Sequence, residues 1–366
     1  MSEKTPPPGD ASLRARFRGM LFDLDGVVFR GHVAVPHAVE VINEMRAAGV
    51  GVAFVTNNAS SPPEDVGDRL RGLGVRMRDE EVVTSAQAAA AYVARLVPPG
   101  APVLAIGGPG VARALQGVGL VPVLPADRAA ASRPVEAVLQ GFGQDIGWSD
   151  LAEASYAVQT GVPWVATNGD LTIPMAGGIA PGNGSLLGCV RNASGVDPVA
   201  IVGKPHPPLY ELAASVLGVP ADGTLAIGDR LDTDIAGAVA VGMESLWVTT
   251  GANTPADTAL APPSHRPRFV ACDLRGLREP YDDPVVDAQP GVYRATCATA
   301  EVTVAEGTVR DARRGTPNER LRAFIVACWA AADGGMPLDQ DSVRRCSEAL
   351  TSDKDNLADQ DARGTS

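Results

Sequence analysis

The feature that most constrains this chain is a regular alternation of short apolar runs with longer helical patterns. The apolar run Gly19–Asp25 is followed by Pro36–Ala48, where Val39, Ile42 and Met45 recur at a helical spacing of three. A second apolar run, at 50–55, comes next. Strand, helix and strand joined by short loops indicate a parallel sheet with helices on both faces. In such a doubly wound α/β fold, ligands bind at the carboxyl ends of the strands.

The alternation continues to residue 249 in two further blocks, and then the pattern changes. Residues 84–184 carry enough strands and helices for a separate α/β unit. After about Pro262 the segments PPSHRPRF and YDDPVVDAQPG read as linkers or loops, followed by a hairpin-like run, Val292–Ala305, and an apolar helix, Asn318–Ala332. We therefore expect a core at 12–84 and 185–280, an inserted α/β domain at 85–184, a small α+β region at 285–350, and flexible tails at 1–11 and 354–366.

Charge and cysteine usage narrow the classes of partner and compartment. The chain has 31 Lys and Arg against 43 Asp and Glu, a net charge of −12, so no basic face for a nucleic acid is expected. Five widely spaced Cys and four His form no zinc-binding pattern. The sequence contains no run of 18 apolar residues, so no membrane span is predicted. The first residues lack the apolar core of a signal peptide. We expect a cytoplasmic protein with free thiols.

Two acidic pairs follow apolar runs. Asp23 and Asp25 end the first strand, where two carboxylates at i and i+2 share a face and repel each other unless a cation such as Mg²⁺ offsets their charge. The alternative is a solvated strand end. In GDRLDTD at 228–234, the run TLAIG delivers Asp229, and Asp234 follows about one helical turn later. Helix capping would explain Asp232 but not why two strands end in acids.

Neutral donors and one ammonium follow two other strands. Thr56, Asn57 and Asn58 suit phosphate oxygens, although Thr and Asn are also common turn residues. Gly203-Lys204-Pro205 places an ammonium beside a predicted helix start, two features that favour an anion. Only three of the 31 basic residues are Lys, and Lys204 alone lies away from the termini. Chance composition is the alternative explanation.

Taken together, these four strand ends resemble the haloacid dehalogenase superfamily. FDLDG at 22–26, Thr56, Lys204 and GDRLDTD at 228–234 are similar to its four motifs in order. The segments TNNAS at 56–60, ATNGD at 166–170 and PGNGSL at 181–186 resemble the NagD-like subgroup, whose α/β cap lies between the second and third motifs. The layout, with VVTSAQ at 82–87 and GWSDLAEA at 147–154, also resembles glycerol 3-phosphate phosphatases that carry an extra C-terminal region.

The resemblance implies Mg²⁺-dependent hydrolysis of a phosphate monoester through an aspartyl-phosphate. Asp23 would be the nucleophile and Asp25 the general acid and base. Mg²⁺ would be held by Asp23, by Asp229 and by the backbone carbonyl of Asp25. Asp234 would orient Lys204 or metal-bound water. Thr56 and Lys204 would hold the phosphoryl oxygens. The expected substrate-binding residues are Gly26, Asn57, Asn58, Asp170 and Lys204, although Asp170 could instead close an Asx-turn.

Several alternatives stay open at this point. A phosphonatase lysine is absent because no Lys lies between 84 and 184, and the acid Asp25 argues against a dehalogenase. Glycerol 3-phosphate is the expected substrate, with pyridoxal phosphate, nucleoside monophosphates or other small esters as alternatives, and a non-catalytic phosphometabolite-binding protein as a different class. In the glycerol 3-phosphate phosphatases that this layout resembles, the extra region is likened to part of an N-acetyltransferase fold. Here the acyl-CoA loop pattern is missing, with Arg313 and Arg314 in the nearest stretch, so residues 285–350 are expected to be a degenerate acetyltransferase-like region or to pack or form a homodimer, without acetyltransferase activity.

Overall fold

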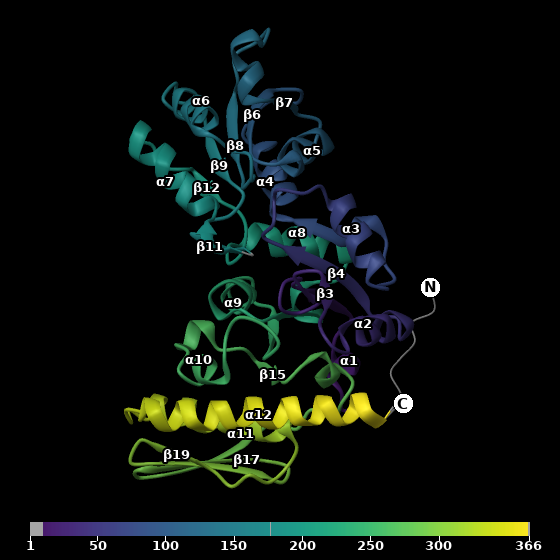
Figure 1. Ribbon diagram of the computed structural model, residues 1–366, viewed down its shortest axis with the longest axis vertical. Helices are drawn as coiled ribbons and strands as arrows, with labels where there is room; N and C mark the ends of the chain where they lie inside the picture. Colours follow the sequence, from purple (N-terminus) through teal and green to yellow (C-terminus); the bar gives the residue numbers. More distant parts are fainter. Residues whose placement is uncertain (1–9, 176, 365–366) are drawn as a thin grey trace. The chain divides into compact units, whose positions relative to one another are not determined.

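The computed structural model describes residues 10–175 and 177–364, with side chains as far as Ser352 (Figure 1). The chain divides into two compact units, and the expected tail residues 1–9 lie outside the described part. The first unit combines the chain up to Gly51 with the chain from Ala221 onward, and the second unit is Val52–Pro220. In the described part no helix combines the length and the apolar character that a membrane crossing requires.

The first unit contains four parallel strands in the order β15-β14-β13-β1. Every residue of β1 and β13 is buried, as expected for parallel strands with both faces covered. The predicted parallel α/β fold is thereby confirmed. The bounds are β1 (Gly19–Phe22), β13 (Thr224–Gly228), β14 (Glu244–Val248), β15 (Phe269–Ala271), α1 (Leu13–Arg16), α2 (Ala38–Ala47), α9 (Ala236–Ala240) and α10 (Pro255–Ala259).

The C-terminal region belongs to this first unit and is an antiparallel sheet packed on helix α11 (Figure 1). The predicted hairpin and apolar helix are confirmed as β17–β18 and α11. The expected loop at 281–291 is wrong, because β16 forms there with all five residues exposed at the sheet edge. Helix α12 continues through the expected tail to Gly364. The bounds are β16 (Val285–Gln289), β17 (Val292–Cys297), β18 (Ala300–Ala305), β19 (Thr308–Asp311), α11 (Pro317–Asp333) and α12 (Gln340–Gly364).

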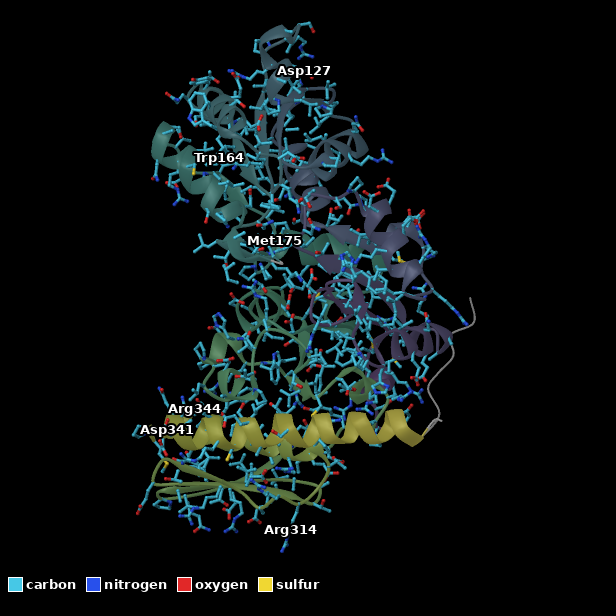
Figure 2. All side chains as sticks on the ribbon, viewed as in Figure 1. Asp127, Trp164, Met175, Arg314, Asp341 and Arg344 are labelled. Atoms are coloured by element: carbon cyan, nitrogen blue, oxygen red, sulfur yellow. The ribbon has the colours of Figure 1, made fainter. Side chains whose placement is uncertain are left out.

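The second unit has a five-stranded parallel sheet in the order β12-β9-β8-β6-β7. Trp164, on β9, is fully buried in its core (Figure 2). An antiparallel hairpin, β10–β11, lies between β9 and α7 in the chain. The bounds are β6 (Pro102–Ile106), β7 (Val121–Val123), β8 (Ala137–Gln140), β9 (Trp164–Ala166), β10 (Thr172–Met175), β11 (Gly178–Pro181), β12 (Ala200–Ile201), α4 (Ser85–Val93), α5 (Pro109–Gly117), α6 (Trp148–Val158) and α7 (Asn183–Ser194).

The same unit contains the parallel pair β4 (Gly51–Thr56, whose first residue belongs to the first unit) and β5 (Val82–Thr84), with helices α3 (Pro63–Gly72) and α8 (Pro207–Leu217). The residues Ser61-Pro62-Pro63-Glu64 predict a capping box that opens this helix, α3. Instead the N-cap is Pro62, without a side-chain hydrogen bond. The two consecutive prolines already restrict the backbone to a helix-entry conformation, so the helix begins without that cap.

Candidate active site

Three carboxylates converge at the strand ends of the first unit. Asp23 follows β1 and Asp229 follows β13, its parallel neighbour, and the Asp23 backbone N–H donates to the Ile227 carbonyl at 2.9 Å. Asp23, Asp229 and Asp234 each offer an oxygen, and these three oxygens lie within 4.8 Å of one another. Like charges this close favour a bound cation, and carboxylate oxygens are the ligands that Mg²⁺ prefers. The donor set therefore fits the predicted metal.

Two glycines leave room for the Asp229 carboxylate. Gly26 has a positive φ of 85°, and a Cβ there would lie 2.6 Å from Asp229 Oδ2. A Cβ on Gly251 would lie only 1.8 Å from the same oxygen, which also accepts a hydrogen bond from the Ala252 N–H at 2.5 Å. The Thr250 hydroxyl donates to the Gly26 carbonyl at 2.6 Å and joins the two loops. Gly26, which was expected to bind substrate, thus borders one of the three clustered carboxylates.

Asp234 holds the turn that presents Asp229. Its Oδ2 accepts hydrogen bonds from the backbone N–H of Asp229 at 3.2 Å and of Arg230 at 3.0 Å. The sequence predicts a helix at Asp232–Val241, but this segment opens as one π-helical turn, Leu231–Ile235, before α9. The N-cap of this turn is Arg230, without a side-chain hydrogen bond, and the exposed carboxylate of Asp232 pairs with Arg230 at 2.8 Å. Asp25 is also exposed, two residues beyond Asp23.

In the second unit, Asn57 joins two other predicted site residues. Its Oδ1 accepts from the Lys204 N–H at 2.7 Å, and its Nδ2 donates to the Lys204 carbonyl at 3.1 Å and to Asp170 Oδ2 at 3.1 Å. Lys204 is 5% exposed, and its ammonium donates to the Val55 carbonyl at 3.2 Å. The Asn57 amide is therefore engaged within the protein, where it sets the backbone position of Lys204.

The neighbouring residues Thr56 and Asn58 shape the turn after β4. Thr56 is buried, and its hydroxyl oxygen accepts from the Asn58 N–H at 3.1 Å. Asn58 Oδ1 accepts from both the N–H and the hydroxyl of Ser60, at 2.9 and 2.7 Å. This is the local hydrogen bonding by which asparagine stabilises a turn.

Sequence reasoning missed two buried asparagines that support this set. Asn168 Nδ2 donates to the Asn57 carbonyl at 2.8 Å, and Asn183 Nδ2 donates to the Asn168 carbonyl at 2.8 Å. Asn168 Oδ1 also accepts from the Asp170 N–H at 3.2 Å, which closes an Asx-turn at Asn168. Both asparagines lie in segments that the sequence analysis singled out, ATNGD and PGNGSL, which was the available signal.

Comparisons with known proteins agree with the motifs. The profile of the haloacid dehalogenase-like hydrolases matches residues 20–121, and a HAD-hydrolase-like profile matches 201–277. D-glycerol 3-phosphate phosphatase from Mycobacterium tuberculosis is 42% identical over 313 residues, 85% of this chain and 86% of that protein. An acid sugar phosphatase from Staphylococcus aureus is 34% identical over 66% of this chain and 90% of its own length.

A solved structure shows the same agreement along the chain. The glycerol phosphate phosphatase from M. tuberculosis in complex with magnesium superposes with a TM-score of 0.76 at 39% identity, covering 88% of this chain and 93% of that one. Four ordered motifs, two matching profiles and a relative that is similar over most of both chains lead to one assignment. This chain belongs to the haloacid dehalogenase-like hydrolases.

Proposed function

We propose that this protein is a Mg²⁺-dependent phosphatase that hydrolyses glycerol 3-phosphate to glycerol and phosphate. The observation that carries the proposal is the convergence of Asp23, Asp229 and Asp234 at adjacent strand ends, in a chain 42% identical to a D-glycerol 3-phosphate phosphatase. Three carboxylates alone would repel the substrate's phosphate, so a divalent cation is required there. The similarity to two phosphatases and the acidic donor set support the same reaction class.

In the proposed reaction, Asp23 forms a bond to phosphorus as the bond from phosphorus to the substrate's alkoxide oxygen breaks. Asp25 donates a proton to that oxygen, releasing the alcohol, and then takes a proton from the water that hydrolyses the aspartyl-phosphate. The Asp23 backbone is anchored on β13 through Ile227, which favours a fixed nucleophile. The exposed side chain of Asp25 suits a group that must reach both the substrate and water.

Mg²⁺ would be held by Asp23, the Asp25 carbonyl and Asp229, and would supply positive charge that lets a carboxylate approach a phosphate. We assign Asp234 to the support of this set, because one of its oxygens is engaged by two backbone N–H groups. Gly26 keeps the space beside Asp229 free of a side chain.

We assign Thr56 and Lys204 to the phosphoryl oxygens. The contacts of Asn57 and Asn58 favour a different role from the one expected: Asn57 orients Lys204 and Asp170, and Asn58 holds the turn that carries Thr56. A buried ammonium oriented through its own backbone needs little reorganisation when the anion binds.

For the leaving group, we propose that 85–184 acts as a cap and that Asp170 binds a glycerol hydroxyl. Residues 168–183, which include the β10–β11 hairpin, contain no aromatic residue to stack on a pyridine ring or a base. Leu171, Met175 and Ile179 are exposed there and offer only aliphatic surface. These features favour a small polyol phosphate over pyridoxal phosphate or a nucleotide.

A substrate panel tests the proposal. Purified protein is assayed for phosphate release from glycerol 3-phosphate, sugar phosphates, pyridoxal phosphate and nucleoside monophosphates. We expect the highest kcat/KM on glycerol 3-phosphate. A sugar phosphate is the second candidate, because an acid sugar phosphatase is also a relative. Preference for a nucleotide would contradict the substrate assignment, and no hydrolysis of any ester would favour the non-catalytic binding protein.

Metal removal should abolish this activity. Excess chelator is expected to lower turnover to below about 1% and added Mg²⁺ to restore it, because the three clustered carboxylates otherwise repel the substrate phosphate. The measurement is phosphate release before and after Mg²⁺ is returned. Full turnover in the chelated protein would contradict the proposed metal requirement.

Gly251→Ala is expected to lower kcat/KM by roughly 100-fold, the scale of a misplacement of about 1 Å. Its Cβ would overlap Asp229 Oδ2, so the carboxylate must move. Gly188→Ala is the matched control, because nothing lies within 4 Å of a Cβ at that helical glycine. Equal activity of the two variants would show that Asp229 tolerates the displacement.

We place the protein in the cytoplasm because all five cysteines are free thiols. We place it in glycerol metabolism because glycerol is a product of the proposed reaction. A homodimer remains a proposal, which light scattering coupled to size exclusion would test.

A further inference from the structure

One side chain connects the carboxylate cluster to the hydrophobic core of the first unit. Trp247 lies on β14 directly beside Gly228 of β13, and its indole Nε1 donates a hydrogen bond to the Asp229 carbonyl at 3.0 Å. Trp247 is fully buried. The peptide that follows a metal-site carboxylate is therefore held by a rigid ring that packing keeps in one position.

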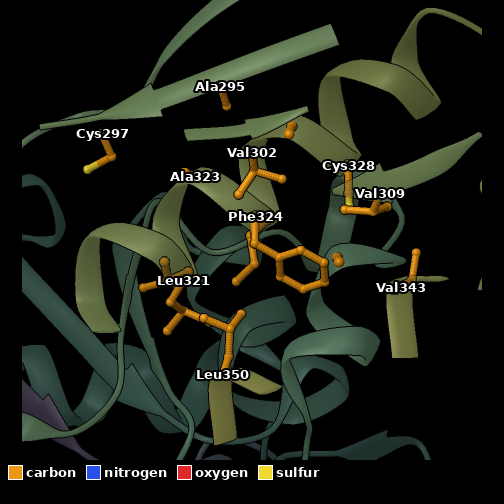
Figure 3. Packing of buried hydrophobic residues seen from close by; sticks show 14 of the residues in the cluster. Ala295, Cys297, Val302, Val309, Leu321, Ala323, Phe324, Cys328, Val343 and Leu350 are labelled. Atoms are coloured by element: carbon orange, nitrogen blue, oxygen red, sulfur yellow. The ribbon is translucent and has the colours of Figure 1, made fainter. Parts of the chain in front are cut away.

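The core around Trp247 is shared between the fourth of the four motifs, GDRLDTD at 228–234 (motif IV), and the C-terminal region. Leu231 and Ile235, from the turn after Asp229, belong to the same cluster of buried residues as Trp247. Figure 3 shows the part of this cluster that the C-terminal region contributes, with Phe324 of α11 at its centre. Other members from that region include Val302 of β18, Leu321 of α11 and Leu350 of α12.

Hydrogen bonds join the C-terminal helices to α10 and to the segment after β15. The Ser347 hydroxyl accepts from the Ala256 N–H at 3.1 Å, and Asn318 Oδ1 accepts from the Cys272 N–H at 2.8 Å. A region held by both apolar packing and hydrogen bonds at several points does not move independently of the residues it covers.

We propose that Trp247 is a positioning residue for Asp229, and that the C-terminal region serves the metal site by enclosing Trp247 and the motif IV turn in one core. The inference rests on the proposed function, in which Asp229 holds Mg²⁺. The indole fixes the Asp229 peptide, and the Asp234 carboxylate fixes the adjoining N–H groups, so the direction of the Asp229 carboxylate is set from both sides. Hydrogen bonds from residues around a metal ligand affect metal affinity because they orient that ligand.

Trp247→Phe tests the proposal, because it keeps an aromatic ring and removes the Nε1 donor. Mn²⁺ is titrated into the full-length protein without substrate, and free Mn²⁺ is followed by electron paramagnetic resonance. Trp329→Phe is the matched control: it removes an equivalent indole-to-carbonyl bond beside the same cluster but not at Asp229. We expect Trp247→Phe to weaken Mn²⁺ binding by about 10-fold, and Trp329→Phe to leave it within about two-fold.

The turnover assay gives a second readout. At saturating Mg²⁺ we expect Trp247→Phe to retain nearly the wild-type KM for substrate, while the Mg²⁺ concentration at half activity rises by the same factor as the Mn²⁺ dissociation constant. A general loss of structure would change both, and near-ultraviolet circular dichroism reports it directly.

A variant in the C-terminal region makes the test independent of how Trp247→Phe folds. Phe324→Leu leaves Trp247 in place and disturbs the shared core from α11. It should weaken Mn²⁺ binding several-fold. Wild-type Mn²⁺ binding by Trp247→Phe, or equal losses in Trp247→Phe and Trp329→Phe, would overturn the proposal. Failure of the wild-type protein to bind Mn²⁺ would instead overturn the proposed function and this inference with it.

Discussion

Replacing Asp23 with asparagine is expected to lower kcat by at least about 10⁴-fold, the scale on which removing a catalytic nucleophile acts in other hydrolases. An amide oxygen does not form the covalent bond to phosphorus that the proposed reaction requires. The variant also loses one of the three carboxylates that gather within 4.8 Å. The measurement is steady-state phosphate release from glycerol 3-phosphate at saturating Mg²⁺.

The same variant should remain folded. The backbone hydrogen bond from Asp23 to Ile227 does not depend on the side chain. Removing one of three clustered negative charges also lessens their repulsion in the metal-free protein, so the unfolding temperature measured in chelator should equal or exceed that of the wild type. A lower unfolding temperature would mean that lost activity reflects lost structure.

Asp232→Asn is the matched control for Asp23→Asn. Asp232 lies in motif IV, but its carboxylate is 62% exposed and pairs with Arg230 on the surface. Such pairs contribute about 0–1 kcal/mol, so activity should stay within about two-fold of the wild type. Substantial turnover by Asp23→Asn would remove Asp23 from the role of nucleophile, whatever the control shows.

Lys204→Arg is expected to lower kcat/KM by roughly 100- to 1,000-fold, comparable to losing one donor to a developing negative charge. Lys204 is 5% exposed, and its ammonium is compact enough to donate to the Val55 carbonyl within the protein. A planar guanidinium is wider and directs its N–H groups differently, so it needs space that a close-packed interior lacks.

The same exchange at another lysine of this chain is the control for Lys204→Arg. Lys354→Arg changes a residue outside the four motifs and should leave kcat/KM unchanged. The affinity for inorganic phosphate, measured by product inhibition, separates anion binding from chemistry and should fall with kcat/KM in Lys204→Arg. Near-normal activity of that variant would mean that any cation suffices at this position, and that the rarity of lysine in this chain is chance.

The secondary structure was predicted best where local signals mark both ends of an element. The apolar pattern after Pro207 predicts a helix at Pro207–Leu217, and α8 has these bounds, because Pro207 opens it and Gly218 ends it in a left-handed conformation with φ of 64°. The edge strand β16 was missed because all five of its residues are exposed, so no buried face imposes an alternation of apolar and polar residues over its whole length. The π-helical turn at 231–235 was expected to be ordinary helix, since nothing in its residues distinguishes the two.

Much of the carboxylate cluster could be predicted because its position depends on short-range pattern. An apolar run followed at once by an acid places that acid at a strand end, and adjacent parallel strands bring their ends together. The positions of Asp23 and Asp229 could be predicted from this pattern alone. The role of Asn57 could not be predicted in the same way, because an asparagine after a strand can donate to a ligand or to the protein itself.

The sequence by itself determined the parallel α/β fold, the strand ends that carry the acids and the ammonium, and the family to which the motifs point. These follow from local apolar periodicity and from the order of residues along the chain. Only the tertiary structure decided which polar groups pair: Asn57 with Lys204, 147 residues apart, and Trp247 with Asp229, 18 residues apart. The physical reason is that a hydrogen bond requires its donor and acceptor within about 3 Å, and for groups distant along the chain the packing of the strands and helices sets that distance.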